Sequence, residues 1–274
     1  MSVLKIDRLT STTGAVVEGV DLREIDDDVV AEVNEALLEH LVLFFPGQAL
    51  EPTEQVAFAR HLGELDVAPF GPKHDDVPEM TVLDQQAPRG EGADAWHSDN
   101  TFRDEPPKMT MLQAVKLPPV GGDTCWSNMY EAYDALSEPM RGLLDGLTAS
   151  HDLTKMLELA IARGNSDADL GAMREAFPAR SHPVVRTHPE TGRKALFVNG
   201  NFTTHINELA EEESRRVLDL LLDHVQTPEF QCRYRWAPGT LTLWDNRCLQ
   251  HYAVPDYETR RIMHRLTICG DEPR

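Results

Sequence analysis

The chain has 274 residues, 41% hydrophobic and 26% charged, which is ordinary for a folded globular protein and enough to bury a sizeable core. Its 46 acidic and 26 basic side chains give a formal net charge of −20, so its surface repels phosphate backbones and we expect no nucleic-acid partner. Four cysteines without C-x-x-C spacing, no apolar leader and no apolar run long enough for a membrane span predict a cytoplasmic protein with reduced thiols and no membrane contact.

The first half of the chain mixes short strands with helices. Residues 29–41 carry apolar side chains at helical spacing, and we expect the preceding Asp27 and Asp28 to cap this helix. Pro139 interrupts the helical pattern over residues 130–146, so we expect a break in the helix there. We predict strands over residues 14–21, 41–45, 80–83, 108–117 and 124–127, and helices over residues 29–41, 53–61 and 130–146.

Short strands dominate the second half. They are predicted over residues 182–187, 194–199, 230–236, 240–244 and 260–268, with one amphipathic helix over residues 210–225. Many short strands with a few helices predict one domain over residues 1–274, mainly β with flanking helices (α+β), built on a jelly roll.

Two segments have the character of active-site lids. Residues 86–95 are rich in Gly, Ala and Pro and lead directly into Trp96 and His97, so they form either a lid or an ordinary surface loop. Residues 155–180 are acidic and contain Ala and Met. We interpret them as short helical pieces or as a second lid.

The most informative motif is His97-Ser98-Asp99, with His251 about 150 residues later. Side chains alternate in an extended segment, so His97 and Asp99 point the same way and Ser98 points away. Two imidazoles and one carboxylate on one metal leave about half of an octahedron open, as in non-haem Fe(II) oxygenases. A histidine in an apolar strand is more often a core residue, but the H-x-D pair makes His251 a candidate third ligand.

Further polar residues are candidates for ligand binding. Period-two alternation places Arg261 and Arg265 on the same face of the strand over residues 260–268. Each guanidinium either binds an anionic ligand or pairs with an Asp or Glu of the protein. Thr124 follows the turn at residues 121–123, and its hydroxyl either donates to a ligand carboxylate or simply ends the turn.

Several segments resemble the TauD/TfdA (taurine dioxygenase) family of Fe(II)/2-oxoglutarate oxygenases, in order and through nearly the whole chain. They are WHSDNTF (96–102), PP (106–107), GGDT (121–124), residues 182–199 and WDNRCLQHYA with RRIMHR (244–265). The resemblance implies a double-stranded β-helix, which is the jelly-roll class. It also implies a dioxygenase that uses Fe(II), 2-oxoglutarate and O2 to hydroxylate a small anionic substrate, releasing succinate and CO2. Taurine-like sulfonates, alkyl sulfates and aryloxyalkanoates are the expected substrates, and a dimer or tetramer is the expected assembly.

The resemblance also assigns roles to residues. The expected iron ligands are His97, Asp99 and His251. The expected 2-oxoglutarate contacts are Thr124 and Arg261. The expected substrate contacts are Arg265, which corresponds to an arginine that meets the substrate anion, together with Asn100 and Phe102. We expect Trp96, Phe102 and Tyr252 either to wall the cavity or to belong to the core.

Two positions depart from taurine enzymes. Those enzymes carry a His near a GEL segment and an Asn three residues before the Trp of the metal motif, where this chain has Ala68 and Ala93. Both groups would have contacted the sulfonate or the amine, so taurine itself is in question.

Two other classes remain open at this stage. A zinc hydrolase could use the same His/Asp/His set, although no general base is evident. A non-catalytic binding module could hold a structural metal, although structural sites usually close their coordination sphere.

Overall fold

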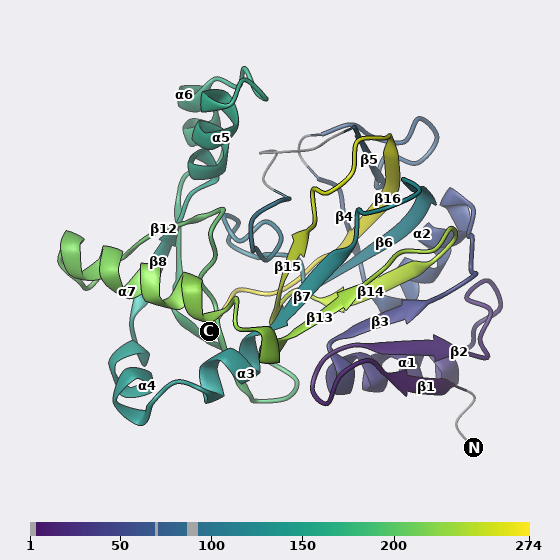
Figure 1. The fold of residues 1–274 in the computed structure, drawn as a ribbon, viewed down its shortest axis with the longest axis horizontal. Coiled ribbons are helices and arrows are strands. Elements are labelled where there is room, and N and C mark those ends of the chain that lie inside the picture. The colour runs from purple at the N-terminus through teal and green to yellow at the C-terminus, as the bar shows by residue number, and fades with distance from the viewer. Residues whose placement is uncertain (1–3, 69–70, 87–92) are drawn as a thin grey trace.

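The computed structural model describes residues 4–68, 71–86 and 93–274 (Figure 1). Within these ranges the chain forms sixteen strands and the following α-helices. The helices are α1 (Asp27–His40), α2 (Pro52–Leu62), α3 (Met129–Asp134), α4 (Glu138–Leu144), α5 (Leu153–Ala162), α6 (Leu170–Ala176) and α7 (Glu211–His224). None of the helices in the described ranges is both long and apolar enough to cross a bilayer.

The main sheet has eight strands in the described part of the chain, in the order β1-β2-β3-β14-β6-β16-β4, with β5 also paired to β16. Its pairings are antiparallel except for β2 with β3. The strands are β1 (Lys5–Arg8), β2 (Ala15–Glu18), β3 (Val42–Phe45), β4 (Leu65–Asp66), β5 (Thr81–Gln85), β6 (Met109–Lys116), β14 (Leu241–Asp245) and β16 (Arg261–Ile268).

A second sheet, β13-β7-β15, lies against the inner face of the main sheet. It consists of β13 (Gln231–Tyr234), β7 (Thr124–Asn128) and β15 (Leu249–Ala253). Trp126 of β7 bridges the two sheets, with its ring 5.2 Å from Phe44 and 5.9 Å from Trp244 of the main sheet. Smaller sheets, β12-β8-β9 and β10-β11, complete the fold. They are β8 (Thr148–His151), β9 (Arg180–Pro183), β10 (Val185–Thr187), β11 (Lys194–Leu196) and β12 (Thr203–Ile206).

The outer face of the main sheet is covered by α1 and α2 (Figure 1). Successive residues of β3 serve the two faces, since Val42 and Phe44 belong to the inner core whereas Leu43 and Phe45 pack beneath the helices. The Phe45 ring lies 6.4 Å from Phe58 of α2. The central strands of the main sheet are therefore buried on both sides, which holds the strands that carry the site in fixed positions.

The predicted elements agree with the structure in type and differ mainly at their ends. The cap of α1 is Asp26, whose side chain accepts from the amide of Val29 at 2.9 Å, so the prediction of Asp27 and Asp28 as caps was wrong. The helical pattern over residues 130–146 is divided into α3 and α4. Ser137 caps α4 and Pro139 lies in its first turn, where a missing amide hydrogen costs nothing.

Residues 155–180 do form helical pieces, as predicted. Figure 1 shows α5 and α6 projecting from one end of the molecule. Their apolar side chains form a small separate cluster with two phenylalanines of the body, Phe102 and Phe202. Of the other predicted lid, residues 87–92 lie outside the described residues.

Candidate metal centre and its cavity

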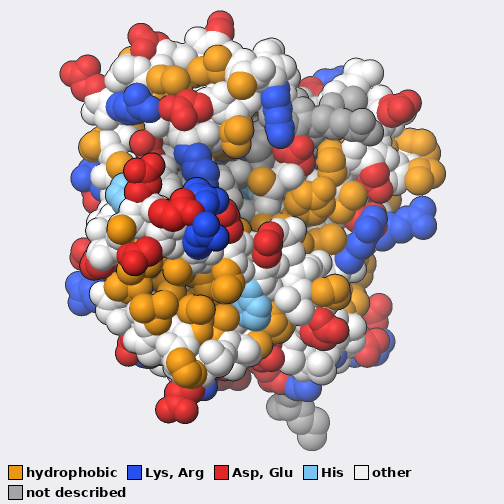
Figure 2. Space-filling view, turned by 60° about the vertical axis from the view of Figure 1, so that its left-hand side comes forward, with side chains coloured by type: hydrophobic (Ala, Val, Ile, Leu, Met, Phe, Trp, Pro, Cys, Tyr) orange, Lys and Arg blue, Asp and Glu red, His pale blue; other side chains and the backbone are white. Residues whose placement is uncertain are grey.

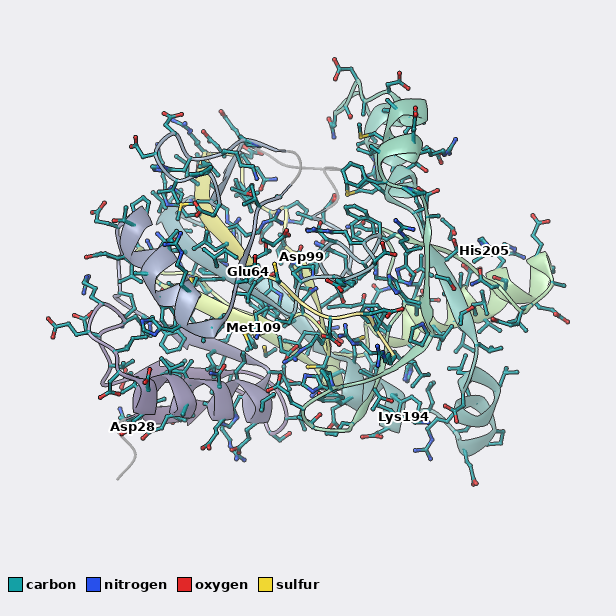
Figure 3. All side chains as sticks on the ribbon, turned by 180° about the vertical axis from the view of Figure 1, so that it is seen from behind. Asp28, Glu64, Asp99, Met109, Lys194 and His205 are labelled. Carbon is teal, nitrogen blue, oxygen red and sulfur yellow. The ribbon has the colours of Figure 1, made fainter. Side chains whose placement is uncertain are left out.

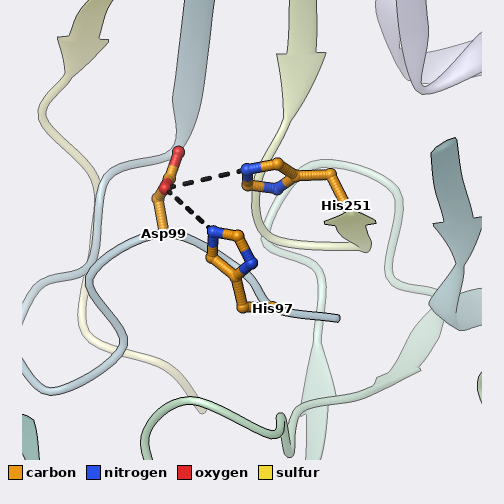
Figure 4. Close-up of side chains that lie close together, drawn as sticks. All are labelled: His97, Asp99 and His251. Atoms are coloured by element: carbon orange, nitrogen blue, oxygen red, sulfur yellow. Dashed lines mark ion pairs between the residues drawn. The ribbon is translucent and has the colours of Figure 1, made fainter. Parts of the chain in front are cut away.

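His97, Asp99 and His251 lie together, as the spacing predicted (Figure 4). The Oδ1 atom of Asp99 is 3.8 Å from Nε2 of His97 and 3.9 Å from Nε2 of His251. One ligand atom from each residue can be chosen so that all lie within 4.8 Å of one another. Figure 3 shows Asp99 near the middle of the molecule. This donor set fits a divalent transition metal and leaves coordination positions open.

The backbone joins the two histidines directly. The amide of His97 donates to the carbonyl of His251 at 3.1 Å, and the amide of His251 donates to the carbonyl of His97 at 2.8 Å. The hydroxyl of Ser98 donates in another direction, to the carbonyl of Leu249 at 2.8 Å. Residues 97–99 thus extend along β15, and alternation turns His97 and Asp99 inward.

Two polar side chains hold Asp99 in place. Thr110 Oγ1 donates to Asp99 Oδ2 at 2.7 Å. Asn246 accepts from the Asp99 amide at 2.7 Å and donates to the carbonyls of Asp99 and Pro107 at 3.0 and 2.9 Å. His97 Nδ1 lies 2.7 Å from the carbonyl oxygen of Ala95, so this nitrogen carries the proton and Nε2 keeps its lone pair. Such outer contacts orient metal ligands and raise their affinity.

The protonation states suit metal binding. Burial lowers the pKa of His251 to about 3 and also lowers the pKa of His97, so both imidazoles are neutral at physiological pH. Burial alone would raise the pKa of Asp99. The charge that His251 carries at low pH, the charges of Arg265 and His97 and the hydrogen bond from Thr110 outweigh that effect and lower the pKa of Asp99 to about 2. Two neutral imidazoles and one carboxylate are the forms that metals bind.

A cavity of about 210 Å³ opens over these ligands. It is lined by every residue predicted to bind metal, co-substrate or substrate, namely His97, Asp99, Asn100, Phe102, Thr124, His251, Arg261 and Arg265. Trp96 and Tyr252 do not line it. Their rings stack on each other, 5.6 Å apart, beside a different hollow. Each is the chain neighbour of an inward-facing histidine, so alternation turns it outward.

Arg261 is the most unusual side chain of the cavity. It is 3% exposed, and its guanidinium has a hydrogen bond with Tyr257, but its Nε and Nη2 atoms have no hydrogen-bond partner among the described residues. Burial lowers the pKa of Arg261, but an arginine remains cationic at neutral pH. A buried charge that lacks a paired anion is costly. Its position therefore fits a ligand carboxylate.

The hydroxyl of Thr124 lines the same cavity as Arg261 and is free to donate a hydrogen bond. Trp236 Nε1 donates to Thr124 Oγ1 at 3.0 Å, which leaves the hydroxyl proton for another acceptor. Trp236 also lies against Arg261, with the guanidinium carbon 5.8 Å from its ring. One indole thus positions both groups that would hold a ligand carboxylate.

The two positions that depart from taurine enzymes, Ala68 and Ala93, lie in different surroundings. Ala93 borders the cavity, whereas Ala68 is 8% exposed and is not part of the lining. Neither methyl group offers a hydrogen bond to a ligand.

Residues 5–267 match the family model described as "Taurine catabolism dioxygenase TauD, TfdA family". The chain belongs to this family. The chain is similar to an alpha-ketoglutarate-dependent sulfate ester dioxygenase of Pseudomonas putida, at 37% identity over 98% of this chain and 91% of the relative. It is also 36% identical to an (S)-phenoxypropionate/alpha-ketoglutarate-dioxygenase of Sphingobium herbicidovorans, over 96% of this chain and 94% of the relative.

A solved structure resembles the whole TauD-family fold of this chain. It is a taurine dioxygenase from Burkholderia xenovorans, with a TM-score of 0.86 and 34% identity over 99% of this chain and 91% of that one. The chain is therefore a member of a family of alpha-ketoglutarate (2-oxoglutarate)-dependent dioxygenases, which use Fe(II), 2-oxoglutarate and O2. Nothing in these relationships supports a zinc hydrolase.

Proposed function

We propose that this TauD-family protein is an Fe(II)- and 2-oxoglutarate-dependent dioxygenase that hydroxylates a small anionic organic substrate. The observation that carries the proposal is the guanidinium of Arg261, with two nitrogens unpartnered among the described residues, in the same cavity as the His97, Asp99 and His251 cluster. A metal-ligand set with open positions and a buried cation that can still accept an anion together match a chelating dicarboxylate. When bound, Fe(II) with 2-oxoglutarate and O2 supplies the oxidation and yields succinate and CO2.

The residues of the chain divide the remaining tasks. His97, Asp99 and His251 would hold the iron through Nε2 atoms and a carboxylate oxygen. Arg261 would take the distal carboxylate of 2-oxoglutarate as a bidentate partner, and Thr124 would donate to the same carboxylate. Both contacts would hold and orient the co-substrate in the cavity.

Arg265 is proposed to meet the anionic group of the substrate. Its Nη1 atom lies 3.5 Å from Asp99 Oδ1, which places positive charge at the rim of the metal site. Asn100 and Phe102 line the same cavity and are proposed substrate contacts. Among the described residues that line this cavity, Asp99 is the only carboxylate. A substrate with a cationic amine therefore finds no free counter-charge, which favours an alkyl sulfate, an aryloxyalkanoate or a sulfonate other than taurine.

The rest of the cavity wall excludes water. Leu153 and Met156 of α5 and Phe202 line it, so we propose that residues 155–180 act as a lid that closes over bound substrate. Residues 86–95 are proposed as the second lid. We also propose that the two facing sheets form a double-stranded β-helix (jelly roll) in a single domain. The antiparallel pairing within both sheets and their shared core support this proposal.

The assembly and compartment are further proposals. All four cysteines lie in the described ranges and are free, which fits the reducing cytoplasm. We propose a homo-oligomer, a dimer or tetramer. Leu143 of α4 and Leu220 of α7 are 46% and 45% exposed, and Figure 2 turns this side of the molecule forward and shows hydrophobic side chains gathered over part of it. Light scattering of the purified protein would test the assembly.

The test of function begins without oxygen. Fe(II) and 2-oxoglutarate added to the purified protein should give the weak visible absorption band of the chelate, which a zinc hydrolase would not give. Admitting O2 with a panel of sulfonates, alkyl sulfates and aryloxyalkanoates should then release succinate in proportion to substrate oxidised. Turnover of any panel member without O2, or no dependence on 2-oxoglutarate, would overturn the proposal.

A further inference from the structure

The cavity over the metal ligands and a second hollow share one lining residue, Phe102. The second hollow has a volume of about 410 Å³ and lies beside α6, with Phe177, Pro178 and Arg180 in its wall. Phe102 is the one residue that belongs to the described linings of both spaces. It is 2% exposed, so it is a buried group where the two spaces meet, and we call it the partition.

Neighbouring rings fix this partition. Phe177 meets Phe102 edge-on from the side of the second hollow, with ring centres 5.7 Å apart and planes at 85°. Phe202 lies 5.3 Å away and lines only the inner cavity. Contacts of this kind hold an aromatic ring in one orientation. Phe102 therefore closes the inner cavity in a defined position.

The inner cavity is small for its proposed contents. Its 210 Å³ lies below the roughly 300–1,000 Å³ of usual ligand pockets, and it must hold both 2-oxoglutarate and a substrate. A substrate whose anionic group lies near Arg265 has little space for a long apolar tail before the tail meets the ring of Phe102.

The second hollow offers that additional length. Four of its five charged side chains are paired with one another, Arg180 with Asp104 at 3.0 Å and Arg103 with Asp66, and the fifth, Glu105, is exposed. Phe177 and its neighbours Ala176 and Pro178 add apolar surface. An uncharged hydrocarbon chain can lie along such a wall without separating an ion pair.

We propose that the ring of Phe102 ends the substrate compartment and sets the longest tail that the enzyme accepts, and that the second hollow becomes an extension of the site once the ring is removed. The inference rests on the proposed function and deepens it. The wild-type substrate is accordingly a short-tailed anion, and Phe102 is the residue that limits chain length.

Binding of linear alkyl sulfates from butyl to decyl would test the proposal. Calorimetry without oxygen, with Mn(II) and saturating 2-oxoglutarate on the full chain, measures affinity without turnover. Each methylene that enters an apolar site tightens binding about fourfold. For the wild type we expect this gain to stop at a definite length. For Phe102→Ala the gain should continue through the longer members of the series.

Phe202→Ala is the matched control, because it removes an equal ring from the inner wall and leaves Phe102 with its edge-on contact to Phe177. For this variant we expect the affinity to keep rising over a few more carbon atoms than in the wild type and then to level off again. Phe102→Leu should give an intermediate limit, and it decides the question if the alanine variant does not fold.

The outcomes separate this inference from the proposed function. If 2-oxoglutarate fails to bind the Mn(II) protein, the function itself is wrong. If 2-oxoglutarate binds but the limiting length is the same in wild type and Phe102 variants, the partition is wrong. The partition is also wrong if no alkyl sulfate binds, or if Phe202→Ala removes the limit as completely as Phe102→Ala does.

Discussion

Replacing Arg261 with methionine should affect stability and co-substrate binding in different ways. In the ligand-free protein the guanidinium is buried with two nitrogen atoms unpartnered among the described residues. Methionine keeps an unbranched apolar stem against Trp236 and removes the buried charge. Because burying an ion costs several kcal/mol, we expect the free energy of unfolding of the ligand-free variant to be equal to or above that of the wild type.

Affinity for 2-oxoglutarate should fall sharply in the same variant. Removing one partner of a buried, hydrogen-bonded charge pair costs about 2–5 kcal/mol, which corresponds to a dissociation constant raised roughly 30-fold to 4,000-fold. Anaerobic calorimetry with Mn(II) measures the affinity, and urea unfolding measures the stability.

Arg260→Met is the matched control for this experiment. Arg260 is the preceding residue, but it is exposed and its Nε donates to Asp84 at 2.7 Å outside the cavity. Its replacement should leave 2-oxoglutarate affinity unchanged. The reasoning would be refuted if Arg261→Met bound 2-oxoglutarate within about threefold of wild type. It would also be refuted if the ligand-free variant lost more than about 2 kcal/mol of stability, since that loss would reveal an anionic protein partner for the guanidinium beyond its hydrogen bond with Tyr257.

Two more predictions concern the site, and a third concerns the buried histidine His151. Thr110→Val removes the hydrogen bond to Asp99, so Mn(II) affinity should fall about 10- to 100-fold while circular dichroism is unchanged; unchanged affinity would contradict this. Arg265→Ala should abolish substrate-stimulated succinate release while 2-oxoglutarate still binds, and a loss of 2-oxoglutarate binding would reassign the residue. Burial holds the pKa of His151 well below the usual 6.5, so the unfolded chain takes up the proton first. The free energy of unfolding is therefore highest above about pH 6.5, and this group lowers it by up to about 1.4 kcal/mol for each pH unit below that. The urea midpoint of His151→Gln should accordingly depend less steeply on pH than that of the wild type.

The metal ligands were predictable from sequence because alternation along an extended chain is a local rule. It correctly paired His97 with Asp99 and placed Arg261 and Arg265 at one cavity. The same alternation turns Trp96 and Tyr252, the chain neighbours of His97 and His251, away from the metal site. It therefore argues against the expectation that they wall the cavity, and the structure places them beside a different hollow.

Other features depend on distant contacts that no local pattern reports. Thr110 meets Asp99 only because β6 lies beside the metal segment. Asn246 lies in the segment that carries His251, but its role as a clamp on Asp99 becomes visible only in three dimensions. The division of β9 from β10, and the strands β8 and β12, were missed since runs of three or four residues carry too little periodicity to identify.

A buried ionic network was also unpredictable. His188 Nε2 lies 3.0 Å from Asp245, and Arg247 donates to both oxygens of the same carboxylate. His188, Asp245 and Cys248 have the geometry of a metal-binding cluster. The amides of residues 190 and 191 donate to Nδ1 of His188, so Nε2 carries the proton and donates to Asp245. With its carboxylate saturated, this cluster stabilises the fold rather than binding a metal.

If His97 and His251 hold iron as proposed, the backbone bridge between them has a consequence for how the iron is acquired in the cell. The two ligands are made far apart in time, because about 150 residues separate them on the ribosome. The three side chains come together only once β15 has been synthesised and has paired, so we expect metal loading to follow folding. The reciprocal backbone hydrogen bonds between His97 and His251 then keep the two segments joined whether or not an ion is present. We expect iron starvation to leave a folded, dormant population that regains activity when supply returns.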